Sequence, residues 1–121
     1  MNNNKLPIRM KVTDIAGSNL CVSSEDGSAV FEKLLAALNT DRSIELDFSG
    51  IELVISAFLN AAIGRLVEHL TIPQIEGRIT FTHLSEDDRE LIDRVLDNAV
   101  LYYEEPDRFR KSLEMEEEDA K

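Results

Sequence analysis

One short stretch of the chain carries the residues whose types and spacing could do chemistry. It reads LDFSGIELVISAFLNAAIG over residues 46–64, where a strand-like run ends at Ser49-Gly50 and a helix-like run follows Ser56. Serine and glycine at the end of a strand favour a tight turn. A serine directly before a run of helical apolar spacing is typical of a helix N-cap. We therefore expect Ser56 to cap a helix that begins near Ala57, at an exposed junction of strand, loop and helix.

The other chemically capable side chains are two carboxylates, two histidines and one thiol. Glu45 and Asp47 are two residues apart on a predicted strand, so we expect both to face away from the core as solvated carboxylates. His69 and His83 end a predicted helix and a predicted strand, where solvated or hydrogen-bonded histidines are expected. Cys21 lies in an apolar run and is expected to be buried. The spacings match no metal, phosphate-binding or catalytic motif, so we expect no enzyme activity, metal or cofactor.

The charge of the chain limits its partners. Its 121 residues carry 24 acidic and 13 basic side chains, for a net charge of −11. Nucleic acids and anionic membranes both require a basic surface, so neither is an expected partner. No apolar run is long enough to cross a membrane, and the first residues do not resemble a secretion signal. We therefore expect a cytoplasmic protein.

Hydrophobic periodicity predicts the elements that position these residues. Alternation of apolar and polar residues indicates strands, and apolar spacings of three and four indicate helices. Ser85 with Asp88 three residues later is typical of a capping box. Pro73 and Gly77 are expected to bracket a loop. The predicted elements are strands over 8–12 and 20–22 paired as a hairpin, a helix over 24–39, a strand over 43–48, a helix over 57–70, a strand over 78–83 and a helix over 85–103.

This order, β-β-α-β-α-β-α, predicts a two-layer α/β domain. The strands are amphipathic, whereas parallel strands buried on both faces are apolar throughout. Helices should therefore cover one face of a mixed sheet of about four strands. We expect this domain to span residues 1–105. Pro106 should end the last helix, and residues 106–121 should hold a short helix that packs Phe109 and Leu113, followed by an acidic tail.

The residues SIELDFSGIELVISAFLNAAIGRL, over 43–66, resemble the core of the STAS fold. This fold is shared by sulfate transporters and anti-sigma-factor antagonists, and the resemblance is closest to an uncharacterised STAS-like branch. In the antagonists, a comparable strand leads to an Asp-Ser-Ser-Gly segment whose second serine is phosphorylated by a kinase of the GHKL type. Laid over that segment, Ile55 takes the aspartate place, Ser56 the first serine, Ala57 the acceptor serine and Phe58 the glycine. The acceptor hydroxyl is therefore missing, and Ser56 is one residue away.

The resemblance implies a non-catalytic signalling module that binds a protein partner, such as a GHKL-type ATPase or kinase. The partner would dock on the loop over 49–56 and on the first turns of the following helix. Ser56 is the candidate phosphorylation site, and Phe58 is either core or interface. The expected partner-binding residues are Ser49, Gly50, Ser56, Ala57, Asn60 and Arg65.

Three alternatives stay open. The first is a STAS domain that senses a small molecule or a nucleotide, as some members of the wider fold are thought to do. The absence of a glycine-rich cradle and the acidity of the chain weigh against this reading. The second is a homo-oligomer without other partners, and the third is a small enzyme. A second register, with Ser49 as the phosphate acceptor, places the acceptor before the loop and fits the antagonist pattern less well.

Overall fold

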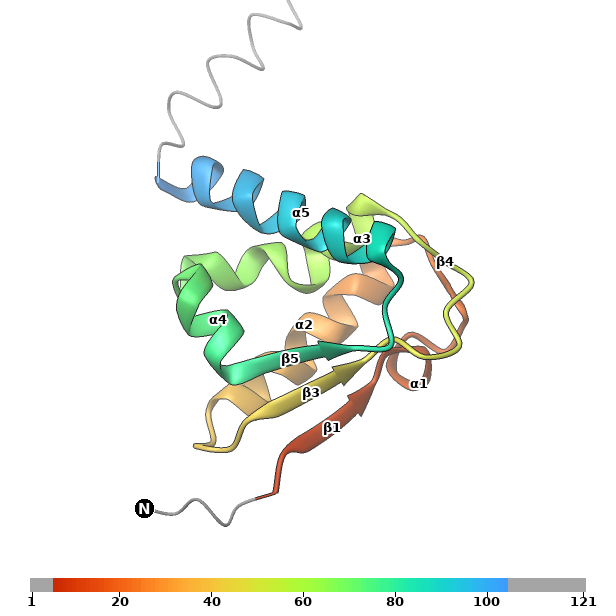
Figure 1. Cartoon of the computed structure of the whole chain (residues 1–121), viewed down its shortest axis with the longest axis horizontal. Helices are drawn as coiled ribbons and strands as arrows, with labels where there is room; N and C mark the ends of the chain where they lie inside the picture. Colours follow the sequence, from red (N-terminus) through yellow and green to blue (C-terminus); the bar gives the residue numbers. More distant parts are fainter. Residues whose placement is uncertain (1–5, 105–121) are drawn as a thin grey trace, which may run out of the picture.

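The computed structural model describes residues 6–104. The larger sheet has β3 at its centre, where it pairs with β1 on one side and β5 on the other (Figure 1). The elements are β1 (Ile8–Lys11), α1 (Val12–Ala16), β2 (Leu20–Cys21), α2 (Ser24–Leu38), β3 (Ile44–Asp47), β4 (Leu53–Val54), α3 (Ser56–Ala62), the 3₁₀ helix η1 (Gly64–Glu68), α4 (Ile72–Arg78), β5 (Ile79–Thr82) and α5 (Glu86–Glu104).

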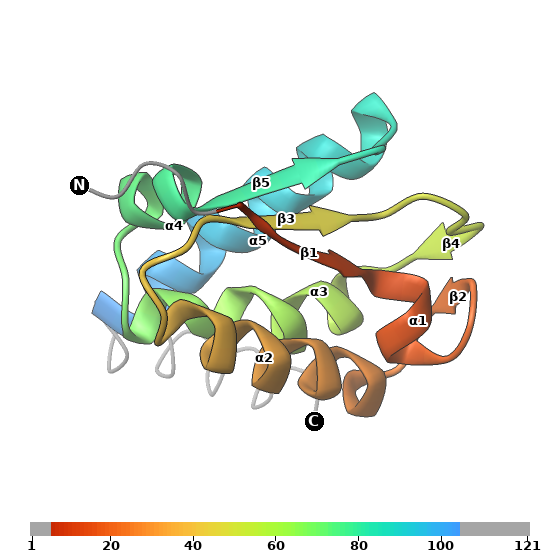
Figure 2. The same cartoon turned by 90° about the horizontal axis from the view of Figure 1, so that it is seen from below.

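The strands form two small parallel sheets. β1, β3 and β5 make the larger sheet, in which Ile44 of β3 pairs with Ile8 and with Ile79. β2 and β4 make a separate two-stranded sheet. α2 and α3 lie along one face of the larger sheet, and α5 crosses beside β5 (Figures 1 and 2). The α/β class and the helix-covered face are confirmed, whereas the predicted mixed sheet of about four strands is wrong because every described pair is parallel.

The predicted hairpin between the first two strands is also wrong. β1 ends at Lys11, and the chain enters α1, which closes at Gly17 in the left-handed conformation with φ of 74°. β2 then pairs with β4 instead of β1. A helix of five residues is too short to show a helical period, so the alternation of Ile8, Met10 and Val12 concealed it.

α2 agrees with its predicted bounds and packs closely on α3. The hydroxyl of Ser23 accepts the backbone N–H of Asp26 at 3.1 Å and caps the helix. Gly27 is buried where the two helices meet, and a Cβ there would overlap with the carbonyl oxygen of Phe58. Glycine at this position therefore allows the backbones to approach.

The helix predicted over 57–70 is divided in the structure. α3 ends at Ala62, Ile63 leaves helical geometry with φ of −124°, and η1 follows. Gly64 at the junction is buried next to Val95 and Ala99 of α5.

The loop predicted between Pro73 and Gly77 is the helix α4. Thr71 and Gln74 form a reciprocal capping box, in which each side chain accepts the other residue's backbone N–H. Pro73 lies in the first turn of α4, where its missing N–H costs no hydrogen bond. Proline was therefore a helix-start signal at this place.

A single apolar core joins the helices to the covered face of the larger sheet. Phe58 is fully buried, which settles it as a core residue. Ser85 accepts the backbone N–H of Asp88 at 3.1 Å, so the predicted cap before α5 is confirmed. The largest fully buried side chains are Phe58, Leu34, Ile44, Leu46, Leu59, Ile63, Leu66, Ile75, Ile79, Ile92, Leu96 and Val12. The short helix and acidic tail predicted for 106–121 lie outside the described residues.

Candidate functional site

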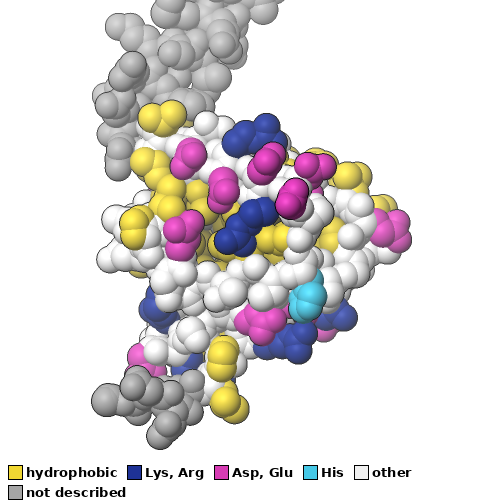
Figure 3. All heavy atoms as spheres, viewed as in Figure 1, with side chains coloured by type: hydrophobic (Ala, Val, Ile, Leu, Met, Phe, Trp, Pro, Cys, Tyr) yellow, Lys and Arg dark blue, Asp and Glu magenta, His cyan; other side chains and the backbone are white. Residues whose placement is uncertain are grey.

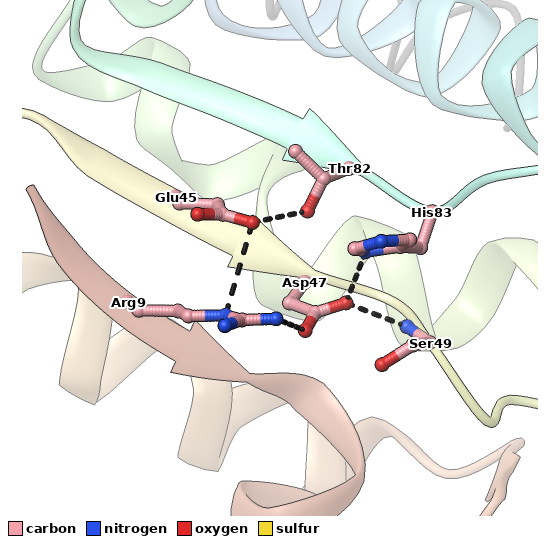
Figure 4. Close-up of polar contacts among 6 residues, drawn as sticks. All are labelled: Arg9, Glu45, Asp47, Ser49, Thr82 and His83. Carbon is pink, nitrogen blue, oxygen red and sulfur yellow. Dashed lines mark hydrogen bonds and ion pairs between the residues drawn. The ribbon is translucent and has the colours of Figure 1, made fainter.

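Acidic, basic and histidine side chains gather on the open face of the larger sheet (Figure 3). They form a polar cluster at the carboxyl end of β3 (Figure 4). Its centre is Asp47, whose side chain is 1% exposed. Arg9 Nη2 of β1 donates to Asp47 Oδ2 at 2.8 Å. His83 Nδ1, just after β5, lies 2.8 Å from Asp47 Oδ1, and the backbone N–H of Ser49 donates to the same oxygen at 2.9 Å. One carboxylate thus joins all three strands of the sheet to the loop that follows β3.

The Asp47 carboxylate is stabilised by its neighbours in the cluster. Burial alone raises the pKa of Asp47, but the Ser49 N–H, the Arg9 guanidinium and His83 outweigh burial and hold this pKa well below its usual range. The hydrogen bond to Asp47 also raises the pKa of Arg9. Glu45 accepts the Thr82 hydroxyl at 2.9 Å and lies 3.8 Å from Arg9 Nε. Asp47 is therefore ionised at neutral pH and acts as an internal anchor.

The same cluster offers three donor atoms of the kind that bind metals. One atom each from Glu45, Asp47 and His83 lie within 4.8 Å of one another. The Arg9 guanidinium, however, occupies the space between the two carboxylates and pairs with both. A divalent cation would have to displace Arg9, so the geometry fits an ion-pair network better than a metal centre.

The sequence-based expectation for these side chains is corrected in part. Glu45 and Asp47 do face away from the core, but Asp47 is buried and fully partnered instead of solvated. His83 is hydrogen-bonded, as expected, and adopts a positive φ of 60° where the chain turns from β5 toward α5. The side-chain partners of Asp47, Arg9 and His83, come from distant parts of the sequence, so no local spacing indicated the cluster.

Asp47 also sets the start of the loop that was expected to bind a partner. Its bond to the Ser49 N–H forms an Asx-type turn. Gly50 follows with φ of 80°, a conformation that favours glycine. The chain then runs alongside β2. The backbone N–H of Glu52 donates to the carbonyl oxygen of Asn19, and the backbone N–H of Ile55 donates to the carbonyl oxygen of Cys21.

The pairing of β2 with β4 creates an apolar surface, which we call the β2–β4 patch and define as Leu20, Val22 and Leu53. Leu20 and Leu53 are direct register partners, and their side chains are 45% and 50% exposed. Val22 continues the same alternation and is 43% exposed. Their neighbours Cys21 and Val54 point inward and are buried. A short strand pair thus places three large apolar side chains at the surface.

α3 begins directly after this patch and presents its polar stripe outward. Ser56, Ala57 and Asn60 are exposed and share one side of the helix, since they are three and four residues apart. The expectation that Ser56 caps the helix is wrong: Ile55 is the N-cap residue, and no side-chain capping bond forms there. The helix begins one residue earlier than predicted, so Ser56 is its first residue.

The six residues expected to bind a partner therefore fall into two groups. Ser49 and Gly50 lie at the end of β3 beside Asp47, and Ser49 lines a hollow of about 380 Å³ with Arg9 and Lys11. Ser56, Ala57, Asn60 and Arg65 follow one another along α3 and η1. No sequence signal indicated the β2–β4 patch, because the pattern around Leu20 and Val22 is equally typical of core residues in a hairpin strand.

The fold and the junction between β3 and α3 agree with one known family. The chain belongs to the family described as STAS-like domain of unknown function (DUF4325), whose model matches residues 26–89. The match contains the β3–α3 junction and all six expected binding residues. No curated protein and no solved structure matches the chain.

Over residues 6–104, no helix is both long enough and apolar enough to cross a bilayer.

Proposed function

We propose that this chain is a non-catalytic cytoplasmic signalling module that binds a protein partner of the GHKL ATPase or kinase type. The partner would contact the β2–β4 patch, the loop over 49–56 and the outward side of α3. The choice of partner class rests on the resemblance of residues 43–66 to anti-sigma-factor antagonists.

The observation that carries the proposal is the exposed pair Leu20 and Leu53 next to the start of α3. Large apolar side chains that gather at one place on the surface of a small domain are typical of interaction sites. The chain as a whole has a net charge of −11. A partner whose interface has an apolar centre and basic residues around it would therefore be favoured electrostatically.

Ser56 is the candidate phosphorylation site on this surface. Its side chain is exposed and forms no capping bond, so its hydroxyl is accessible to a kinase without unfolding of α3. The reaction would transfer the γ-phosphoryl group of ATP to Ser56 Oγ and release ADP and a proton. Ser49 is half-buried beside the Asp47 cluster and is the weaker acceptor.

The test is affinity capture from native lysate with the tagged protein, with and without ATP. Captured proteins and the intact mass of the bait are both measured by mass spectrometry. Capture of a GHKL-type protein supports docking, and a mass increase of one phosphate that Ser56→Ala abolishes and Ser49→Ala does not supports the phosphorylation step. Capture that is unchanged by Ser56→Glu together with Asn60→Arg would show that the surface is assigned wrongly.

A second candidate function is sensing of a small molecule. It is favoured by a hollow between η1 and α5 that is lined by polar side chains, among them Arg65 and Asn98. A ligand that binds only the folded state raises the melting temperature, so a thermal-shift panel that includes nucleotides separates the two functions.

A further inference from the structure

A hollow of about 400 Å³ lies where α3 and η1 meet the carboxyl-terminal half of α5. Its volume falls in the range of small-molecule sites, roughly 300–1,000 Å³. The hollow exists because small residues, Gly64 and Ala99, line it where larger side chains would fill the space. The complete lining is Asn60, Gly64, Arg65, Asn98, Ala99, Tyr102 and Tyr103.

Arg65 supplies a positioned cation to this hollow. Its guanidinium carbon lies 3.9 Å from the ring centroid of Phe31, which is itself buried. Stacking on an aromatic face fixes the plane of a guanidinium and leaves its N–H groups free at the edge. Among residues 6–104, the Arg65 side chain forms no ion pair and no hydrogen bond, although carboxylates outnumber cations in the chain.

Groups that can donate hydrogen bonds surround this cation. Asn60 of α3 and Asn98 of α5 bring two amides, and Tyr102 and Tyr103 bring two phenol rings packed edge to face, with centroids 4.9 Å apart. Burial is the main reason that the pKa of Tyr103 is raised, and the charge of Glu68 adds to it. The Tyr103 hydroxyl is therefore protonated at neutral pH and can donate.

We infer that this hollow binds a small aromatic monocarboxylate. A carboxylate matches the two-pronged edge of a guanidinium, and it accepts hydrogen bonds from amides and phenols. A ring next to the carboxylate would pack against the tyrosines. The net charge of −11 and the nearby Glu68 oppose ligands with several negative charges. This site concerns the isolated chain, so it does not depend on the proposed protein partner.

The test uses benzoate as the probe and ¹⁵N-resolved NMR titration of the full chain. For a ligand of this size we expect a dissociation constant on the order of 1 mM. Shifts should concentrate at the side-chain amides of Asn60 and Asn98 and at Arg65 Nε. Benzamide has the same shape without the charge and should bind at least about fivefold more weakly.

Variants locate the site. Arg65→Met retains the apolar stem that packs on Phe31 and should raise the benzoate dissociation constant at least about tenfold. Arg65→Lys retains the charge without the planar edge and should give an intermediate value. Arg94→Met, which removes an exposed arginine of α5 that does not line the hollow, should change nothing. An unaltered thermal transition shows that each variant is folded.

Three results of the benzoate titrations would overturn the inference. They are equal binding of benzoate and benzamide, binding by Arg65→Met equal to that of the unaltered chain, and no shifts in the hollow at 20-fold excess over the expected constant, about 20 mM benzoate. Tighter binding of phenyl phosphate than of benzoate would likewise overturn the carboxylate assignment. Because all these measurements use the isolated chain, their failure leaves the partner proposal intact.

Discussion

Leu20 and Leu53 lie side by side in the parallel register of β2 and β4, with both side chains about half exposed. The pairing that exposes them also buries Cys21 and Val54 on the opposite side of the strands. Since the side-chain period of a strand is two, a shift of one residue in this register would exchange the two faces. The β2–β4 patch is thus a direct consequence of how these two strands pair.

The two serines at helix starts should respond differently to replacement by alanine. Ser23→Ala removes the bond from Asp26 N–H and should lower the free energy of unfolding by about 1 kcal/mol. Ser56→Ala removes no capping bond and should change it by less than about 0.5 kcal/mol. Urea denaturation of the two variants measures both values. A loss in Ser56→Ala as large as that in Ser23→Ala would mean that Ser56 caps α3 after all.

Replacing Asp47 should weaken the fold and flatten its response to acid. Asp47→Asn loses the charge that pairs with Arg9 and should cost about 1–3 kcal/mol of unfolding free energy at pH 7.

The pH dependence follows from the lowered pKa of Asp47. Below the unfolded-state value of about 3.9 the unfolded chain binds a proton that the folded chain does not, so stability falls as pH falls. The ionised group's contribution is complete above that value. Urea denaturation between neutral pH and pH 3 should therefore show a smaller acid loss for Asp47→Asn than for the exposed-site control Asp93→Asn. Equal losses would contradict the anchoring role of Asp47.

The buried Gly27 should tolerate no side chain. A Cβ there overlaps with the carbonyl oxygen of Phe58, so Gly27→Ala must separate α2 from α3 and should cost about 1–3 kcal/mol or more. Gly77 in α4 is the matched control, because a Cβ there meets nothing within 4 Å. Gly77→Ala should leave stability unchanged or raise it by up to about 1 kcal/mol. Equal thermal shifts in the two variants would show that the α2–α3 contact is looser than described.

The thiol of Cys21 should be unreactive in the folded protein. Burial, with a smaller contribution from the charge of Asp26, raises its pKa to about 11. Alkylation by iodoacetamide at pH 8 should be at least about a hundredfold slower in buffer than in denaturant, because the thiolate is the reactive form. Mass spectrometry of the modified fraction over time gives both rates. Fast modification of the native chain would show that β2 opens readily.

Sequence patterns predicted the elements that depend on local signals and failed where distant residues decide. The apolar spacing of α2, the Ser85–Asp88 cap before α5 and the alternation of β3 were sufficient to place these elements. The pairing of β2 with β4 was not predictable, because the choice between β1 and β4 as its partner depends on the short helix α1. For the same reason the Asp47 cluster was missed: Arg9 and His83 reach Asp47 only after β1, β3 and β5 align.

In α3, too, some features follow from local sequence signals and others do not. Apolar spacing was sufficient to predict this helix, and the structure places Ser56, Ala57 and Asn60 on its exposed side. The precise start of the helix was not predictable, since Ile55 serves as the N-cap residue without a side-chain bond. The break at Ile63 depends on how Gly64 packs against α5, which no local signal indicates.

The most direct test of the partner-binding account compares two leucines of similar exposure. Leu53 lies in the β2–β4 patch, whereas Leu101 on α5 is 55% exposed and lies outside it. Tagged wild-type protein, Leu53→Arg and Leu101→Arg are used for affinity capture from native lysate with ATP, after each is shown to unfold at the same temperature. If the β2–β4 patch is the docking surface, wild type and Leu101→Arg capture a GHKL-type ATPase or kinase, and Leu53→Arg captures at least about tenfold less. Equal capture by all three proteins, or greater loss with Leu101→Arg, would contradict it.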